Sequence, residues 1–133
     1  MAMILIDTSA IIAILCREDR FHDQAKQTWF DLIEKNETIQ CNNYILLEAI
    51  SLIQRRHGMN ILRTFQMDMM PLLTVEWLGK TEHNEAMNTL LLANRRRLSL
   101  VDFTSFETML RQGIQKAFTF DSHFAEQGFE VIP

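Results

Sequence analysis

Met3-Ile4-Leu5-Ile6, followed directly by Asp7-Thr8-Ser9, is the stretch of sequence that decides the fold. Four consecutive apolar residues predict a short strand buried on both faces, as in a parallel sheet. The apolar residues that follow predict a helix over Thr8–Leu15, which begins as soon as the strand ends. A strand that passes straight into a helix is typical of α/β proteins.

Strands and helices alternate along the rest of the chain. Only four Gly and two Pro interrupt the 133 residues, so we expect many helices and short connections. The predicted further strands are Thr38–Cys41, Leu73–Trp77, Ala117–Phe120 and Phe129–Ile132. The predicted further helices are Phe21–Asn36, a helix capped by Asn42-Asn43 that runs to His57, and then Asn60–Met70, Thr81–Arg97, Ser99–Gly113 and Asp121–Gln127. This order predicts one domain over residues 1–133, a three-layer αβα sandwich with a mostly parallel central sheet.

Composition narrows the class of protein. With 47% hydrophobic and 23% charged residues, the chain resembles an ordinary globular protein. A net charge of −4 argues against non-specific coating of nucleic acid, although it allows a local basic patch. Cys16 and Cys41 have no metal-binding spacing, so we expect reduced core residues. No stretch is long and apolar enough for a membrane span, and Asp7 interrupts the first apolar run, so we expect a cytoplasmic protein.

Four carboxylates stand out because each interrupts or ends an apolar stretch: Asp7, Glu48, Asp102 and Asp121. A carboxylate near apolar surface is costly unless it is capped, paired or bound to a cation. Asp7 and Asp121 end predicted parallel strands, whose carboxyl ends form the ligand-binding edge of such sheets. Carboxylate oxygens are hard ligands suited to Mg²⁺ or Mn²⁺. If the four acids converge, the expected chemistry is phosphodiester hydrolysis.

Each acid also has a structural explanation. Asp7 and Asp121 could be helix N-caps, and Ser99-x-x-Asp102 matches a capping box. Glu48 could be an exposed helical acid near Arg55. Two other acidic-pocket proteins fit less well. A receiver-like phosphoacceptor domain needs an Asp that ends a mid-chain strand, where this chain has only the helical Glu48. A haloacid-dehalogenase-like phosphatase needs an acid at position 9, which is Ser.

The ordered set of motifs resembles the PIN-domain family, specifically its VapC-like toxin ribonucleases of type II toxin–antitoxin systems. Ile4-Leu5-Ile6-Asp7-Thr8-Ser9 is similar to the first acidic motif, and Leu46-Leu47-Glu48-Ala49 occupies the place of the helical Glu. The segments 99–107 and 117–124, the latter followed by Gly128-Phe129, resemble the third and fourth motifs. The similarity spans essentially the whole chain, and Asn42-Asn43 replaces the Ser or Thr that often precedes the Glu-bearing helix.

The resemblance implies a metal-dependent endoribonuclease that leaves a 5′-phosphate and a 3′-hydroxyl. It implies that Asp7, Glu48, Asp102 and Asp121 are catalytic and bind one or two Mg²⁺ or Mn²⁺ ions, with Ser9 supporting Asp7. It further implies a cognate antitoxin protein whose tail occupies the cleft, and a homodimer. The alternative within the family is a PIN-like binding module that has lost catalysis.

Basic residues and one histidine complete the candidates. Arg95, Arg96 and Arg97 could guide an RNA backbone, or they could lie at a helix end and complement its dipole. His123 follows Asp121 by two residues and could touch substrate, but we expect a surface or capping role.

Overall fold

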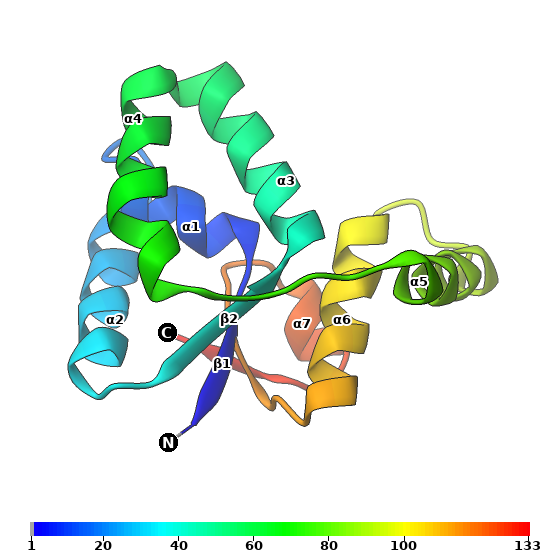
Figure 1. Ribbon diagram of the computed structural model, residues 1–133. Helices are drawn as coiled ribbons and strands as arrows, with labels where there is room; N and C mark the ends of the chain where they lie inside the picture. Colours follow the sequence, from blue (N-terminus) through cyan, green and yellow to red (C-terminus); the bar gives the residue numbers. More distant parts are fainter. Residues whose placement is uncertain (1) are drawn as a thin grey trace.

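Five parallel strands form the central sheet in this computed structural model, which describes residues 2–133 (Figure 1). The strand order is β3-β2-β1-β4-β5, and every neighbouring pair is parallel. The strands are β1 (Met3–Ile6), β2 (Thr38–Asn42), β3 (Thr74–Glu76), β4 (Lys116–Phe118) and β5 (Glu130–Ile132). Since β1 lies in the middle, the acid that follows it is placed at the centre of the carboxyl edge.

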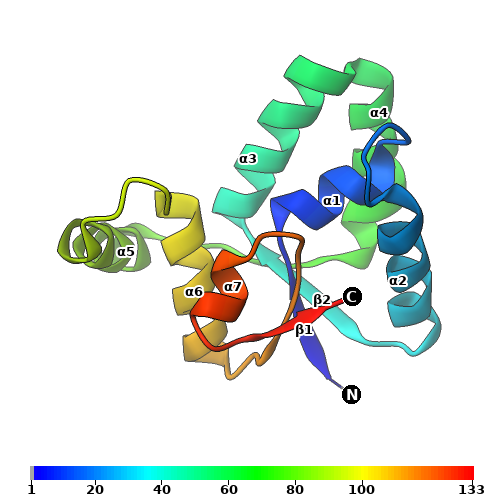
Figure 2. The same ribbon diagram turned by 180° about the vertical axis from the view of Figure 1, so that it is seen from behind.

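Helices cover both faces of the sheet. They are α1 (Thr8–Leu15), α2 (His22–Glu34), α3 (Asn43–Leu52), α4 (Met59–Thr64), α5 (Lys80–Ala93), α6 (Leu100–Gln112) and α7 (His123–Glu126). The two ribbon views place α1, α2 and α4 on one side of the sheet, and α6 and α7 on the other (Figures 1 and 2). The predicted αβα sandwich is therefore confirmed, with a sheet that is parallel throughout.

The core explains why the first strand is continuously apolar. Ile4, Leu5 and Ile6 are at most 2% exposed, because helices pack on both faces of β1. Phe118 in β4 and Phe65 beyond α4 are also completely buried. Cys16 and Cys41 are buried and unpaired, as expected. None of the helices within residues 2–133 is long and apolar enough to cross a membrane.

Capping residues and a glycine predicted several helix boundaries correctly. Asn42 is the N-cap of α3 and accepts a hydrogen bond from the Ile45 amide at 2.9 Å. Beyond Leu52 the helix continues as a π-helical turn to His57, and Gly58, at φ 93°, ends it as predicted. A second π-helical turn, Phe65–Met69, follows α4, and a short 3-10 turn, Met70–Leu72, includes Pro71.

Three predicted boundaries near the acids are wrong. The helix expected to reach Arg97 ends at Ala93, because Asn94 adopts the left-handed conformation (φ 53°) that terminates helices. Arg95, Arg96 and Arg97 therefore lie in the connection between α5 and α6 and not inside the helix. The strand expected to reach Phe120 ends at Phe118, and α7 begins at His123, two residues after the predicted start.

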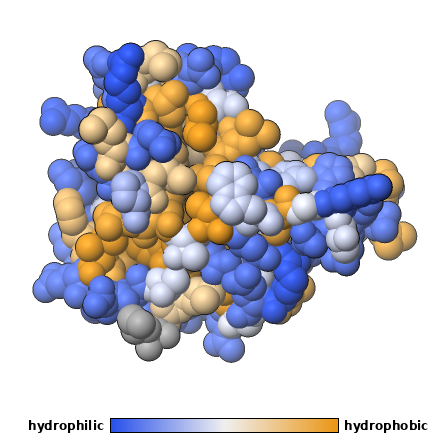
Figure 3. All heavy atoms as spheres, viewed as in Figure 1, coloured by the Kyte–Doolittle hydropathy of each residue, from blue (hydrophilic) through white to orange (hydrophobic). Residues whose placement is uncertain are grey.

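One face of the molecule has exposed apolar side chains beside the edge strand β3. Figure 3 shows hydrophobic residues gathered in the middle of this face, with hydrophilic residues around its margin. Leu72, just before β3, is 48% exposed, and Trp77, just after it, is 70% exposed. Contiguous exposed apolar surface is often an interaction site.

Candidate active site

The four carboxylates meet in one cavity at the carboxyl edge of the sheet. Asp7 follows β1, Glu48 lies in α3, Asp102 lies in the first turn of α6, and Asp121 lies in the loop after β4; all four line a cavity of about 360 Å³. Two larger cavities, of about 440 and 560 Å³, each have only one acid among their lining residues. The acidic cavity is thus distinguished by its chemistry and not by its size.

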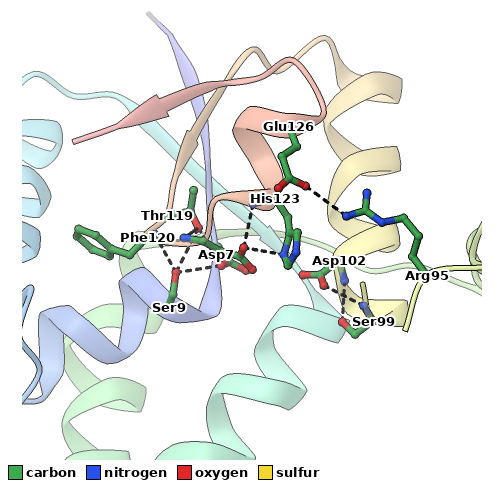
Figure 4. Close-up of polar contacts among 10 residues, drawn as sticks. Asp7, Ser9, Arg95, Ser99, Asp102, Thr119, Phe120, His123 and Glu126 are labelled. Carbon is green, nitrogen blue, oxygen red and sulfur yellow. Dashed lines mark hydrogen bonds and ion pairs between the residues drawn. The ribbon is translucent and has the colours of Figure 1, made fainter. Parts of the chain in front are cut away.

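Asp7 is held by a network of hydroxyl groups (Figure 4). Its side chain is buried, and its Oδ2 accepts hydrogen bonds from Ser9 Oγ and Thr119 Oγ1, both at 3.0 Å. Each hydroxyl in turn accepts a backbone N–H, Ser9 from Phe120 and Thr119 from Asp121, again at 3.0 Å. This network ties the start of α1 to the loop that carries Asp121. The contact predicted between Ser9 and Asp7 is present.

Asp7 occupies the N-cap position of α1, but its side chain makes no capping hydrogen bond. The carboxylate is therefore not explained as a cap. Burial raises its pKa from 3.8 to about 6, against the opposing effect of hydrogen bonds from Ser9 and Thr119. The nearby negative charge of Asp102 raises the pKa further. A buried carboxylate beside another acid is stabilised in its charged form by a cation.

Asp102 is both a capping residue and a lining residue of the cavity. Its Oδ2 accepts the Ser99 N–H at 2.9 Å, while the Asp102 N–H donates to Ser99 Oγ at 3.2 Å, so the predicted capping box is present. The box uses Oδ2 and leaves Oδ1 for another ligand. Burial raises the pKa of Asp102, the Ser99 amide opposes this, and the charge of Asp121 raises the pKa again.

Glu48 is half-buried and lines the acidic cavity. It forms no hydrogen bond or ion pair with any residue from 2 to 133, Arg55 included. Arg56, in the π-helical turn that follows α3, lines the same cavity and is exposed.

Asp121 is not the cap of α7, which begins two residues later, but its Oδ1 accepts the His123 N–H at 2.9 Å. The His123 ring lies beside it. One ligand atom from each of Asp102, Asp121 and His123 falls within 4.8 Å of the other two. Thr119 and His123 are therefore site residues that sequence reasoning did not select. The signal for both was their position inside the segment 117–124, on either side of Asp121.

The acidic cavity is not lined by the three consecutive arginines, Arg95, Arg96 and Arg97. Arg95 forms an ion pair with Glu126 at 3.5 Å, in which both side chains are about half exposed, at 48% each (Figure 4). Arg96 and Arg97 are exposed in the connection that leads to Ser99, which does line the cavity.

The donor set fits a hard divalent cation. Four carboxylates from four separate parts of the chain line one cavity, and burial, with a smaller effect of the neighbouring acids, raises the pKa values of Asp7 and Asp102. Thr8 Oγ1 is buried without a hydrogen-bond partner among the described residues, and Thr8 lines the same cavity. A buried polar atom without a protein partner commonly contacts an ordered water or an ion.

Comparisons with known proteins agree with this geometry. The chain is 32% identical over 133 residues to VapC20 of Mycobacterium tuberculosis, a 23S rRNA-specific endonuclease, covering 98% of this chain and 99% of that protein. The crystal structure of VapC20, described as a sarcin-ricin loop cleaving toxin, is similar with a TM-score of 0.85 over the same shares of the two chains. FitAcB from Neisseria gonorrhoeae, 13% identical, has the same fold with a TM-score of 0.69, over 98% of this chain and 97% of that one.

VapBC2 from Rickettsia felis, solved bound to a DNA fragment from its promoter, also shares the fold. It is 11% identical with a TM-score of 0.70, over 97% of this chain and 96% of that one. The family model of the PIN domain matches residues 4–130. The chain belongs to the PIN-domain family, in its VapC-like branch.

Proposed function

We propose that this protein is a metal-dependent endoribonuclease that acts as the toxin of a toxin–antitoxin pair. The observation that carries the proposal is the convergence of Asp7, Glu48, Asp102 and Asp121 in one cavity at the carboxyl edge of the sheet. The near full-length similarity to a 23S rRNA-specific endonuclease supports RNA as the substrate class.

The four carboxylates would hold one or two divalent ions, Mg²⁺ or Mn²⁺. When bound, such an ion polarises a phosphoryl oxygen and makes water acidic enough to attack phosphorus. The carboxylates come from four elements that are fixed by packing, so the site is preorganised by the fold. Burial and, to a smaller extent, the charges of neighbouring acids raise the pKa values of Asp7 and Asp102, so a bound cation would favour their charged forms.

Several side chains would position the catalytic groups and the substrate. Ser9 and Thr119 hold Asp7 in one orientation through two hydrogen bonds. Glu48, which has no hydrogen-bond or ion-pair partner among residues 2–133, would be free to accept a proton from the attacking water. The products would carry a 5′-phosphate and a 3′-hydroxyl. The guanidinium of Arg56 lines the cavity and would neutralise a phosphate next to the scissile one.

The exposed connection Arg95–Arg97 would contact the RNA backbone farther from the cleavage point, with Arg95 released from its exposed pair with Glu126. Exposed pairs of this kind contribute little to stability, so their rearrangement costs little.

The proposed partners are a cognate antitoxin that covers the acidic cavity and a second copy of the chain. Exposed apolar side chains beside β3 and on α5, where Leu92 is 86% exposed, support protein–protein contacts. A cytoplasmic location is part of the proposal, because ribosomal RNA, the first substrate to test, is found in the cytoplasm.

Cleavage assays on total RNA and on 23S rRNA, with mapping of product ends, test the proposal. We expect cleavage with Mn²⁺ or Mg²⁺ that is lost in EDTA and in the variants Asp7→Asn and Asp121→Asn. Asp68→Asn, at an exposed acid far along the chain from these motifs, is the matched control and should keep full activity. Undiminished cleavage by Asp121→Asn would exclude the site. No cleavage of any RNA by the folded wild type would favour the catalytically inactive binding module.

A further inference from the structure

His123 lies against Asp121, one of the acids that line the acidic cavity, although its position in the sequence suggested a surface or capping role. It is the first residue of α7, and its side chain is 20% exposed. Its Nδ1 lies 2.7 Å from Asp121 Oδ1. Figure 4 shows the ring directed toward Asp102, which comes from a different element.

The contact between the His123 ring and Asp121 is close, but it is not a hydrogen bond. Nδ1 is buried and has no hydrogen-bond partner within the described part of the chain, because the carboxylate lies off the direction of a ring N–H. The same Oδ1 already accepts the backbone N–H of His123 at 2.9 Å. A protonated ring would pair with the carboxylate at this separation, whereas a neutral ring that presents its Nδ1 lone pair would repel it unless a cation lies beside both atoms.

A divalent cation satisfies both atoms. Ligand bonds of about 2.1 Å place adjacent ligands of an octahedral ion about 3 Å apart, which is close to the Nδ1–Oδ1 separation. A carboxylate oxygen of Asp102 lies in the same group, in which every ligand atom is within 4.8 Å of the others. The capping box occupies Asp102 Oδ2 and leaves Oδ1 free to be that ligand. The three side chains thus offer two oxygens and one nitrogen to one ion.

We propose that His123 is a nitrogen ligand of the bound metal, and that the site consequently selects Mn²⁺ over Mg²⁺. The inference rests on the proposed metal site but not on RNA as the substrate. Mg²⁺ takes oxygen ligands almost exclusively, whereas imidazole binds first-row transition ions well. A site of four carboxylates alone discriminates poorly between the two ions. Replacing one oxygen ligand by the His123 nitrogen favours the transition ion.

Electron spin echo spectroscopy of the Mn²⁺-loaded, full-length protein tests the nitrogen ligand directly, without any RNA. We expect nitrogen modulation from a directly bound imidazole, changed to the ¹⁵N pattern when the protein is produced with ¹⁵N-labelled histidine. The chain has four histidines, so variants assign the signal. It should be lost in His123→Ala and in His123→Gln, and kept in His83→Ala, whose ring contacts Tyr44 on α3 and does not line the acidic cavity.

Calorimetric titration with Mn²⁺ and Mg²⁺ gives a second readout. We expect His123→Ala to weaken Mn²⁺ binding by at least about tenfold, as loss of groups around a metal usually does, and to change Mg²⁺ binding much less. If His123 only orients Asp121, both ions lose affinity equally and no nitrogen modulation is seen in the wild type; either result overturns the inference. Because the wild-type spectrum is decisive by itself, poor folding of a variant does not prevent the test.

The outcomes separate this inference from the proposed function. Nitrogen modulation in a protein that cleaves no RNA supports the His123 ligand and rejects the ribonuclease. RNA cleavage without nitrogen modulation keeps the ribonuclease and rejects the His123 ligand. Failure of the wild type to bind Mn²⁺ rejects the metal site and this inference with it.

Discussion

Replacing Asp7 by Asn should stabilise the metal-free protein at neutral pH while it removes nuclease activity. Burial raises the pKa of Asp7 from 3.8 to about 6, so the folded state binds a proton there more tightly than the unfolded state does. Stability contributed by such a group is present at low pH and is lost as the pH rises from about 4 through 6. A difference of roughly 2 in pKa corresponds to about 3 kcal/mol, lost in full above pH 7.

Asn removes the charge and keeps the shape. Its side-chain oxygen can still accept the hydrogen bonds that Ser9 and Thr119 donate to Asp7 Oδ2. The variant therefore avoids the cost of a buried charge without leaving those hydroxyls unpaired. Allowing for imperfect amide packing, we expect Asp7→Asn to be more stable than wild type by about 1–3 kcal/mol at pH 8, and nearly equal to it at pH 4.

Urea unfolding in EDTA at a series of pH values from 4 to 8 measures this difference. Asp68→Asn, which removes an exposed acid, should show no comparable pH dependence relative to wild type. Adding Mn²⁺ should reverse the order, because an ion that binds only the folded wild type raises its free energy of unfolding by mass action. The reasoning would be refuted if Asp7→Asn were less stable than wild type at pH 8. It would also be refuted if the difference in free energy of unfolding between variant and wild type were the same at pH 4 and pH 8.

Three further substitutions test the supports of the site. Asn42→Ala removes the α3 cap and the amide that donates to Thr108 at 3.2 Å in the core, so urea unfolding should show a loss of about 2–4 kcal/mol. Ser99→Ala breaks the capping box, and thermal melting should show a loss of about 1 kcal/mol, with metal binding by Asp102 retained in calorimetry. Thr119→Val leaves the Asp121 N–H without its acceptor, so kcat should fall at least about tenfold while the protein, by circular dichroism, stays folded. An unchanged kcat in Thr119→Val would show that the hydroxyl network does not position the loop.

Features encoded by neighbouring residues were predictable from the sequence. The buried strand that ends at Asp7, the cap at Asn42 and the box between Ser99 and Asp102 each depend on contacts within a few residues. The ends of β4 and α5 were not predictable in this way. Just after the end of β4, Thr119 donates a hydrogen bond to Asp7, which lies 112 positions away in the sequence. A contact of that range has no local pattern.

The functional role of these acids is difficult to recognise in the sequence, because one residue can cap a helix with some of its atoms and bind a ligand with others. Asp7 begins α1 with its backbone, since its carbonyl oxygen accepts the N–H groups of Ala10 and Ile11 at 3.1 Å, and its carboxylate faces the cavity. Asp102 closes its capping box with Oδ2 and retains Oδ1. A structural explanation for such an acid therefore does not exclude a functional one. A functional role is distinguished from a structural one by the convergence of carboxylates from several elements. The order of the parallel strands predicts this convergence, and the geometry of the cavity tests it.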